Sequence, residues 1–303
     1  MKSLLRILLI TAGASVFLFR NAVASPITFN TALPVSQNEF LFQETLLDRA
    51  LDDGTAVVPG MEVTARGGVS ILAYGVTGKL TLFGMLPYLD KTLDVTTLMG
   101  RIRRSNSGLG DSRFFARYTV YQDNQPGANF RVAPILGVVA PTGSDTYTDA
   151  YGVQPRAFQL GTGAWGKLAG VIMTYQTLNY EFDSSLTYQA NGTHNGYSAG
   201  DIAELDASFQ YRLLPVSLQG IQGVPHFLYA VIESNLIHIG RDVQNGSINS
   251  NSGGTEWLIS PGIQYVTSRW VAEAAIQIPL QRNPYGNALR DKYILHAGVR
   301  FNF

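Results

Sequence analysis

Residues 204–213 read ELDASFQYRL, and their polar and apolar side chains alternate without interruption. One set contains Leu205, Phe209 and Tyr211, and the other contains Glu204 and Asp206. Successive side chains of a β-strand point to opposite faces of the sheet. The segment therefore predicts a strand with one face in an apolar medium and the other face in water.

The same alternation recurs along the chain, for example over 79–89 and 269–281. In these segments the apolar set begins or ends with Tyr, Trp or Phe, as expected where strands cross a membrane interface. Glu44 interrupts the apolar set of the first segment. We expect twelve strands, near residues 39–46, 61–74, 79–89, 112–121, 130–140, 157–175, 179–190, 201–213, 226–240, 255–266, 269–281 and 292–303.

The composition favours an all-β membrane protein. Of 303 residues, 46% are apolar and 15% are charged, whereas soluble domains average roughly 25% charged residues. Beyond Arg20 no uncharged apolar run approaches the ~18 residues that a membrane helix requires. We therefore predict a transmembrane antiparallel β-barrel. The absence of cysteine excludes disulfides and a lipid-modified N-terminal cysteine.

The predicted connections differ in length. Residues 75–78 form a tight turn, whereas 90–111, 141–156 and 241–254 predict long loops, in which acidic residues such as Asp149 are expected only to solvate the surface. Outer-membrane barrels have short periplasmic turns and longer extracellular loops. An even number of strands then places both termini on the periplasmic side.

The first residues predict a secretory signal. Lys2 and Arg6 precede an uncharged apolar stretch over 7–19, and Ala22 to Ala24 are small. The expected division is a signal peptide over 1–24, a periplasmic N-terminal segment over 25–38 and a barrel over 39–303, in the outer membrane of a Gram-negative bacterium.

The C-terminal residues have the pattern of an assembly signal. His296, Gly298, Phe301 and Phe303 resemble the terminal sequence that bacterial barrels present to their assembly machinery. The expected partners are therefore this machinery during biogenesis and the lipid of the outer membrane.

Several motifs resemble one protein family. They are YGVTGKL at 74–80, GLGD at 108–111, APTG at 140–143, SPGIQY at 260–265 and QIPL at 277–280. In this order they resemble the bacterial outer-membrane family named for the meta-pathway of phenol degradation. The resemblance implies an outer-membrane barrel of transporter type, and it carries no catalytic motif.

Charged side chains on the water-facing sets are candidates for a substrate path. Opposed rows of charge inside a barrel can orient a permeating solute. The same side chains can instead pair with one another and fill a narrow interior. The candidates are Arg66, Arg113, Arg117, Glu181, Asp183, Glu204, Asp206, Glu273 and Arg300, and Glu62 is placed with them.

Two motifs suggest other functions. Gly161 to Gly166 fits a dinucleotide fingerprint, but the following residues keep the rhythm of a strand, where that fingerprint requires a helix. His194 and Ser198 suggest a hydrolase, but they lie in a glycine-rich loop. The histidines lack the spacing of a zinc site.

These observations predict a channel or transporter for small molecules, aromatic ones among them, acting by passive or facilitated diffusion. We expect no cofactor, no metal, no nucleic-acid partner and no enzymatic activity. The alternative is a non-conducting structural or binding barrel with a plugged interior, whose long loops contact partners. A barrel hydrolase is a third, weaker hypothesis.

Overall fold

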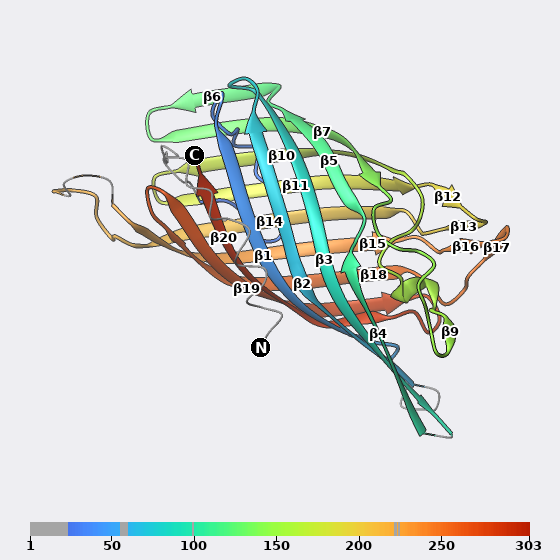
Figure 1. Ribbon diagram of the computed structural model, residues 1–303. Helices are drawn as coiled ribbons and strands as arrows, with labels where there is room; N and C mark the ends of the chain where they lie inside the picture. Colours follow the sequence, from blue (N-terminus) through green and yellow to red (C-terminus); the bar gives the residue numbers. More distant parts are fainter. Residues whose placement is uncertain (1–23, 55–59, 99, 221–222, 224) are drawn as a thin grey trace.

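The computed structural model describes residues 24–54, 60–98, 100–220, 223 and 225–303. Twelve antiparallel strands close into a barrel, and the last strand pairs with the first (Figure 1). The wall strands are β1 (Phe40–Asp52), β2 (Gly60–Gly75), β3 (Leu80–Thr97), β5 (Ser112–Tyr118), β7 (Ala128–Ala140), β10 (Gly166–Thr177), β11 (Tyr180–Asn191), β14 (Ile202–Leu214), β15 (Phe227–Ile239), β18 (Gly254–Val266), β19 (Trp270–Pro284) and β20 (Arg290–Asn302).

The outer face of the wall is apolar and the inner face is mostly closed to solvent. On β14, Leu205 and Tyr211 are 49% and 50% exposed, whereas Asp206 and Gln210 are 4% and 0% exposed. A soluble protein would bury the first set. An apolar surface that surrounds the whole barrel requires lipid as its solvent. The predicted fold class, a transmembrane antiparallel β-barrel, is confirmed.

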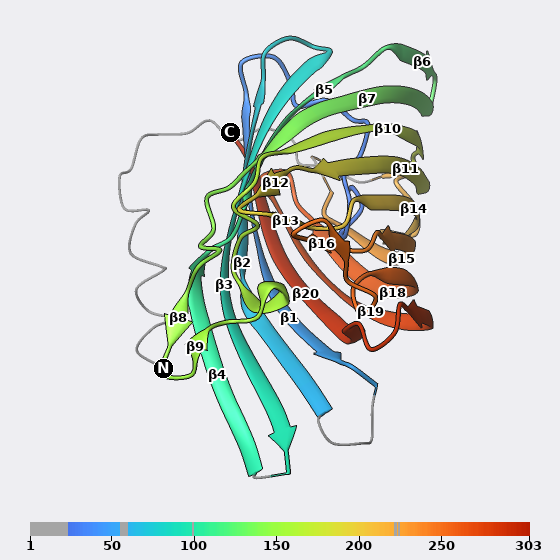
Figure 2. The same ribbon diagram turned by 90° about the vertical axis from the view of Figure 1, so that its right-hand side faces the viewer.

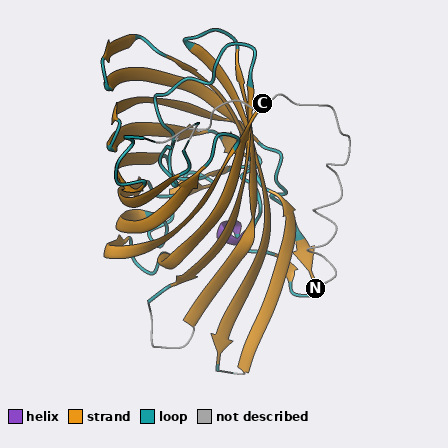
Figure 3. Cartoon of the chain, turned by 90° about the vertical axis from the view of Figure 1, so that its left-hand side faces the viewer, coloured by secondary structure: helices purple, strands orange, loops and turns teal. Residues whose placement is uncertain are grey.

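The two ends of the barrel differ, and we call them the short-turn end and the loop end. At the short-turn end, residues 76–79, 178–179 and 267–269 join successive strands. This end lies on the left in Figure 1 and faces the viewer in Figure 3. The loop end faces the viewer in Figure 2. In bacterial barrels the short turns face the periplasm.

Aromatic side chains line the short-turn end. The rings of Phe40 and Tyr74 lie 4.7 Å apart, and those of Tyr265 and Trp270 lie 5.6 Å apart. Amphipathic rings are favoured at the level of the lipid headgroups. They therefore mark one membrane interface.

The prediction of a long loop over 90–111 is wrong. β3 continues to Thr97, and β4 (Gly100–Leu109) pairs with it in a hairpin that projects beyond the rim (Figure 1). Asp94 lies opposite Arg103 in this hairpin and accepts a 3.1 Å hydrogen bond from Arg101. Such cross-strand charge pairs stabilise neighbouring strands, so polar residues that read as a loop extend the sheet instead.

The expected strand over 157–175 begins later than predicted. Residues 156–158 form the short 3-10 helix η1 (Arg156–Phe158), and β10 starts only at Gly166. Phe158 is 2% exposed because it packs against Val63 and Leu93 on the inner wall. The apolar Phe158 therefore fits the pattern of the predicted strand, although it lies in the loop and not in a strand.

The loop between β7 and β10 contains β8 (Thr148–Asp149), β9 (Gly152–Val153) and η1. Through Phe158 it contacts the inner wall at the loop end. Beside it β12 (Thr193–His194), β13 (Tyr197–Ser198), β16 (Val243–Gln244) and β17 (Ser247–Ile248) form a small sheet (Figure 2). At the opposite end β6 (Tyr121–Gln125) pairs with β7. Within the described residues no helix is long and apolar enough to cross a membrane.

The seam between β1 and β20 closes the barrel. The carboxylate of Glu44 lies on the outer face of β1 and accepts a 2.5 Å hydrogen bond from Ser70, so it does not interrupt the strand. The backbone of Phe40 donates to Phe303 over 2.7 Å and accepts from it over 2.9 Å, and their rings stack at 6.0 Å. The last residue of the chain therefore completes the wall.

We expect deletion of Phe303 to lower the yield of folded barrel several-fold, because it removes two backbone hydrogen bonds in lipid and the terminal aromatic ring. The measurement is the fraction of membrane-extracted protein that shifts on a denaturing gel when it is heated. The matched control is Phe209→Ala, which removes an outward aromatic ring away from the seam. Equal folded yields for the two variants would contradict the prediction.

Candidate functional site

The lumen has two chemically different halves. Over β2, β3, β5, β7 and β10 the inward side chains form an apolar wall that includes Ile71, Phe83, Phe115, Ile135 and Ile172. The rings of Phe83 and Phe115 stack at 4.6 Å. These strands also carry apolar residues on their outer face. In β3 the set expected to face water begins with Lys79 and Thr81 but continues with Phe83 and Met85, so the apolar inner wall was missed.

The other half of the lumen, from β11 to β20, is polar and connected by hydrogen bonds. Asp206 accepts from Ser185 over 2.7 Å and from Asn235 over 2.9 Å, and Asn235 accepts from Gln277 over 2.9 Å. Gln277 in turn pairs with His296 over 2.8 Å. Buried polar groups need such partners because they have lost water.

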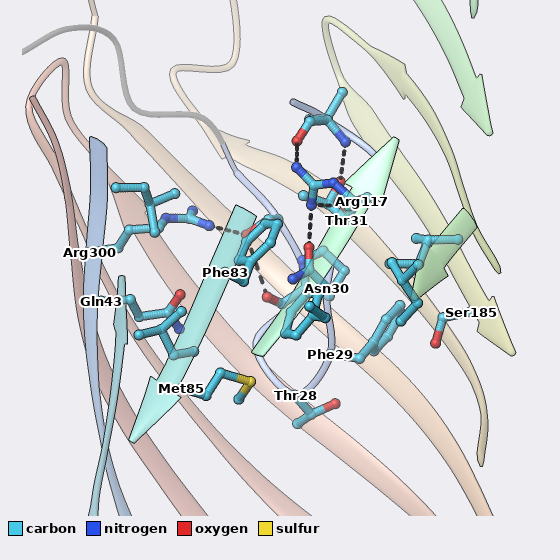
Figure 4. Close-up of a pocket in the computed structure, with 18 of the residues that line it drawn as sticks. Thr28, Phe29, Asn30, Thr31, Gln43, Phe83, Met85, Arg117, Ser185 and Arg300 are labelled. Atoms are coloured by element: carbon cyan, nitrogen blue, oxygen red, sulfur yellow. Dashed lines mark hydrogen bonds between the residues drawn. The ribbon is translucent and has the colours of Figure 1, made fainter. Parts of the chain in front are cut away.

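Residues 24–35 lie inside the barrel and contact both halves (Figure 4), whereas residues 36–38 are exposed at the short-turn end. Gln264 binds the backbone of Ser25, donating over 3.0 Å and accepting over 3.3 Å. Further along, the amide of Val35 donates to the hydroxyl of Thr81 over 3.3 Å. In Figure 4, Phe29 lies between Met85 and Ser185. We call residues 24–35 the lumenal segment because these contacts place it inside the barrel. The periplasmic N-terminal segment expected over 25–38 stays a prediction.

Two charged side chains hold the backbone of this segment. Arg117 donates to the carbonyl oxygens of Thr31 and Leu33 and to the side chain of Asn30. On the opposite half, Glu233 accepts from the amides of Ile27 and Thr28, over 2.7 and 3.1 Å. The cation binds carbonyls and the anion binds amides, so opposed charges in the lumen bind the chain itself.

Most of the predicted path residues also face the lumen. Glu181 and Asp183 are 1% and 0% exposed, and Asp183 accepts from Thr174. Glu273 accepts from Gln264 over 2.7 Å. Arg300 donates to the hydroxyl of Ser25. These side chains are engaged in internal hydrogen bonds.

Two predicted path residues lie on the outer face. In β2 the inward set is odd-numbered, with Ile71 and Ala73 in the apolar core, so Arg66 and Glu62 point outward. Arg66 is 69% exposed and donates to Asp48 over 2.9 Å. The placement of these two residues in the lumen is therefore wrong, because the phase of the strand differs by one residue from the expected one.

Arg113 and Glu204 are different from the other candidates. Both line a cavity of about 400 Å³ that the lumenal segment bounds on one side. Within the described part of the chain, neither makes a hydrogen bond or an ion pair. A second cavity of about 410 Å³ lies at the loop end, where Arg156 and Tyr197 form part of its lining.

Two aspartates connect the loop between β7 and β10 to neighbouring parts of the chain. The expectation that such acidic residues only solvate the surface is therefore wrong. Arg104 of β4 donates twice to Asp149, over 2.8 Å each. This guanidinium holds the pKa of the Asp149 carboxyl below its ordinary value. Asp111 accepts from the amides of Gly143 and Thr162, over 3.0 and 2.8 Å.

The other motifs do not form sites. Residues 161–165 lead directly into β10, with no helix that could hold a pyrophosphate group. The hydroxyl of Ser198 donates to the carbonyl of Ala199, and the ring of His194 faces Asn195 at 2.9 Å. No group of three or more histidine or acidic side chains that could hold a metal occurs among the described residues.

A closed barrel with an apolar outer face, an aromatic interface and a mixed lumen defines a transmembrane β-barrel of the bacterial outer-membrane type. The chain belongs to the family described as "Putative MetA-pathway of phenol degradation", whose model matches residues 48–285. The predicted family is therefore confirmed.

The first of two similar solved structures supports the fold. An outer-membrane channel from Pseudomonas putida F1 is similar with a TM-score of 0.65 and 13% identity, over 93% of this chain and 100% of that chain. The β domain of the Bordetella autotransporter BrkA has a TM-score of 0.45 and 11% identity, over 88% and 100% of the two chains. No curated protein matches this chain in sequence.

We expect Arg117→Ala to loosen the lumenal segment, because it leaves one buried and two partly buried acceptors without a donor. An unsatisfied buried acceptor costs about 1 to 3 kcal/mol. Hydrogen exchange at the amides of 27–35 should become at least tenfold faster, since 1.4 kcal/mol is about tenfold. The control is Arg113→Ala, which removes a lumenal arginine that does not bind the segment. Unchanged exchange in the first variant would show that Arg117 does not hold the segment.

We expect Asp149→Asn to free the long loop at neutral pH. The pKa of Asp149 is lowered in the folded loop, so its bond to Arg104 contributes above the ordinary aspartate pKa of about 3.9 and is lost as the pH falls below it. A fluorophore on Val153→Cys, unique because the chain has no cysteine, reports the mobility of the loop. The wild type should become mobile only in acid.

Asp123→Asn, at the opposite end of the barrel, is the matched control for this experiment and should keep the loop rigid at neutral pH. A loop that is equally rigid in Asp149→Asn and in the wild type would show that the bond between Arg104 and Asp149 does not hold the loop.

Proposed function

We propose that this protein is an outer-membrane channel for small molecules that combine an apolar part with a polar group, aromatic molecules among them. The observation that carries the proposal is the division of the lumen into an apolar half and a polar half around a cavity of about 400 Å³. Cavities of this size accommodate small molecules. Transport is by passive or facilitated diffusion.

The two halves of the lumen suit such a solute for a physical reason. A purely polar pore gives no compensation for an aromatic ring, and a purely apolar one leaves a hydroxyl or charged group without hydrogen bonds. In this lumen the Phe83 and Phe115 rings and polar side chains of β11 and β14 line the same cavity. A molecule with both characters can contact both walls at once.

The lumenal segment narrows the short-turn half of the barrel, and this observation favours a competing function. A barrel that keeps the segment in place would be a plugged, non-conducting binding protein. The segment is held by hydrogen bonds to about half of the wall, which water or a solute can replace one at a time. We propose that the segment moves aside during transport.

A disulfide between the segment and the wall tests this function. The hydroxyls of Thr31 and Thr174 lie 3.0 Å apart, and the chain has no cysteine of its own. We expect the oxidised pair Thr31→Cys with Thr174→Cys to conduct several-fold less in planar bilayers than the reduced pair, because the segment cannot leave the lumen. The single variant Thr31→Cys is the control for the loss of the hydroxyl.

Three outcomes decide between the functions. Conductance in the wild type and in the reduced pair that disappears when the pair is oxidised supports a channel gated by the segment. Conductance that oxidation leaves unchanged supports a channel with an open path past the segment. No conductance in the wild type or in the reduced pair, with the folded barrel intact, would reject the channel in favour of the plugged barrel.

We propose further that the chain has no enzymatic activity, in keeping with the hydrogen bonds that Ser198 and His194 make to Ala199 and Asn195 and not to each other. The expected signal peptide lies outside the described residues except for Ala24, and its removal is part of the proposal. So are recognition of Phe301 and Phe303 by the assembly machinery and the periplasmic position of both termini.

A further inference from the structure

Arg113 is a cation that lines the lumen. It lines the cavity of about 400 Å³, and the described residues offer it no hydrogen bond or ion pair. Arg117, four residues further along the strand and on the same inward face, instead donates hydrogen bonds to the lumenal segment. The two arginines therefore differ in role, and only Arg113 is available to a solute.

The side chains next to Arg113 within the sheet are apolar. Its partners in the neighbouring strands are Met85 on β3 and Val139 on β7, and Phe115 is the next inward residue on its own strand. A guanidinium next to apolar side chains has lost part of its hydration, so an anion that binds to it gains more than it would in water.

An aromatic surface lies one step away from this charge. Phe115 is two residues along the strand from Arg113, which corresponds to about 7 Å. Its ring stacks on Phe83 at 4.6 Å, and both rings line the same cavity. The Phe83 and Phe115 side chains are 7% and 9% exposed, and the Arg117 guanidinium lies 4.8 Å from the centre of the Phe83 ring. A solute can therefore contact only the part of this pair that borders the cavity while its anionic group reaches the Arg113 guanidinium.

We infer that Arg113, Phe115 and Phe83 form a binding site in the lumen for a small aromatic carboxylate. The inference rests on the proposed channel function and names the class of solute that the lumen selects. The carboxylate accepts hydrogen bonds from the planar guanidinium, which can bind both of its oxygens.

Glu204 is the corresponding free anion and would favour an aromatic cation. Its partners in the neighbouring strands are Thr187 and Ile237, and Asp206 is the next inward residue on its strand. No aromatic ring lies among these neighbours. A cation bound there would lack the ring contact, and for this reason the structure favours the carboxylate.

The experiment measures uptake of three probes of the same size into liposomes that contain the full mature chain: benzoate, benzyl alcohol and benzylammonium. The variants are Arg113→Gln and Arg113→Lys, and the matched control is Arg66→Gln, an arginine on the outer face. Heat-dependent migration on a denaturing gel verifies that every variant is folded.

We expect Arg113→Gln to reduce benzoate uptake by about tenfold, the loss of one charge-assisted hydrogen bond, while benzyl alcohol changes by less than about twofold. Arg113→Lys should retain part of the benzoate uptake, and Arg66→Gln should retain all of it. In the wild type benzoate should enter faster than benzylammonium.

Two results would overturn the inference while leaving the channel intact. One is equal uptake of benzoate by Arg113→Gln and the wild type, and the other is a preference of the wild type for benzylammonium. If no probe enters through the wild type, the proposed function itself fails. The two failures are therefore distinguishable.

Discussion

Closure of the backbone hydrogen bonds between β1 and β20 is the constraint on which the rest of this molecule depends. In the hydrocarbon core no water can satisfy an exposed amide or carbonyl, so an open sheet edge is excluded. The ladder from Leu41 to Asp52 against β20, completed by the pair of Phe40 and Phe303, leaves the ring without an edge. Closure also defines an inside, and the inside is where the remaining chemistry lies.

The inside of this barrel is filled in two different ways. Polar side chains of β11 to β20 bond with one another, and apolar side chains of β2 to β10 pack together. The lumenal segment joins the two halves because its backbone offers carbonyls to Arg117 and amides to Glu233. A peptide is itself a molecule with apolar and polar parts, so its binding here illustrates the type of solute that this lumen suits.

The charges of the lumen divide into those used for structure and those left free. Arg117, Glu233 and Glu273 have partners within the protein, and removing them would leave buried groups unsatisfied. Arg113 and Glu204 border the cavity and have no such partners among the residues that the structure describes. An unpaired charge next to a cavity has lost part of its hydration energy when the cavity is empty. A bound group of opposite charge would compensate for this loss. Charge type alone did not separate these two groups in the sequence.

The sequence by itself determined the barrel, its strand number and almost all strand positions, because the alternation of residues such as Leu205 and Asp206 reflects a local property, the two-residue period of a strand between lipid and water. It also indicated the inward position of Arg113, Arg117 and Glu273. Only the tertiary structure decided what lies across the lumen from each of them. Arg66 points outward because the strand phase is set by pairing with β1 and β3, and Thr31 meets Thr174 because the chain folds back into the closed barrel. Such contacts join residues that are far apart in the chain, and no local period encodes them.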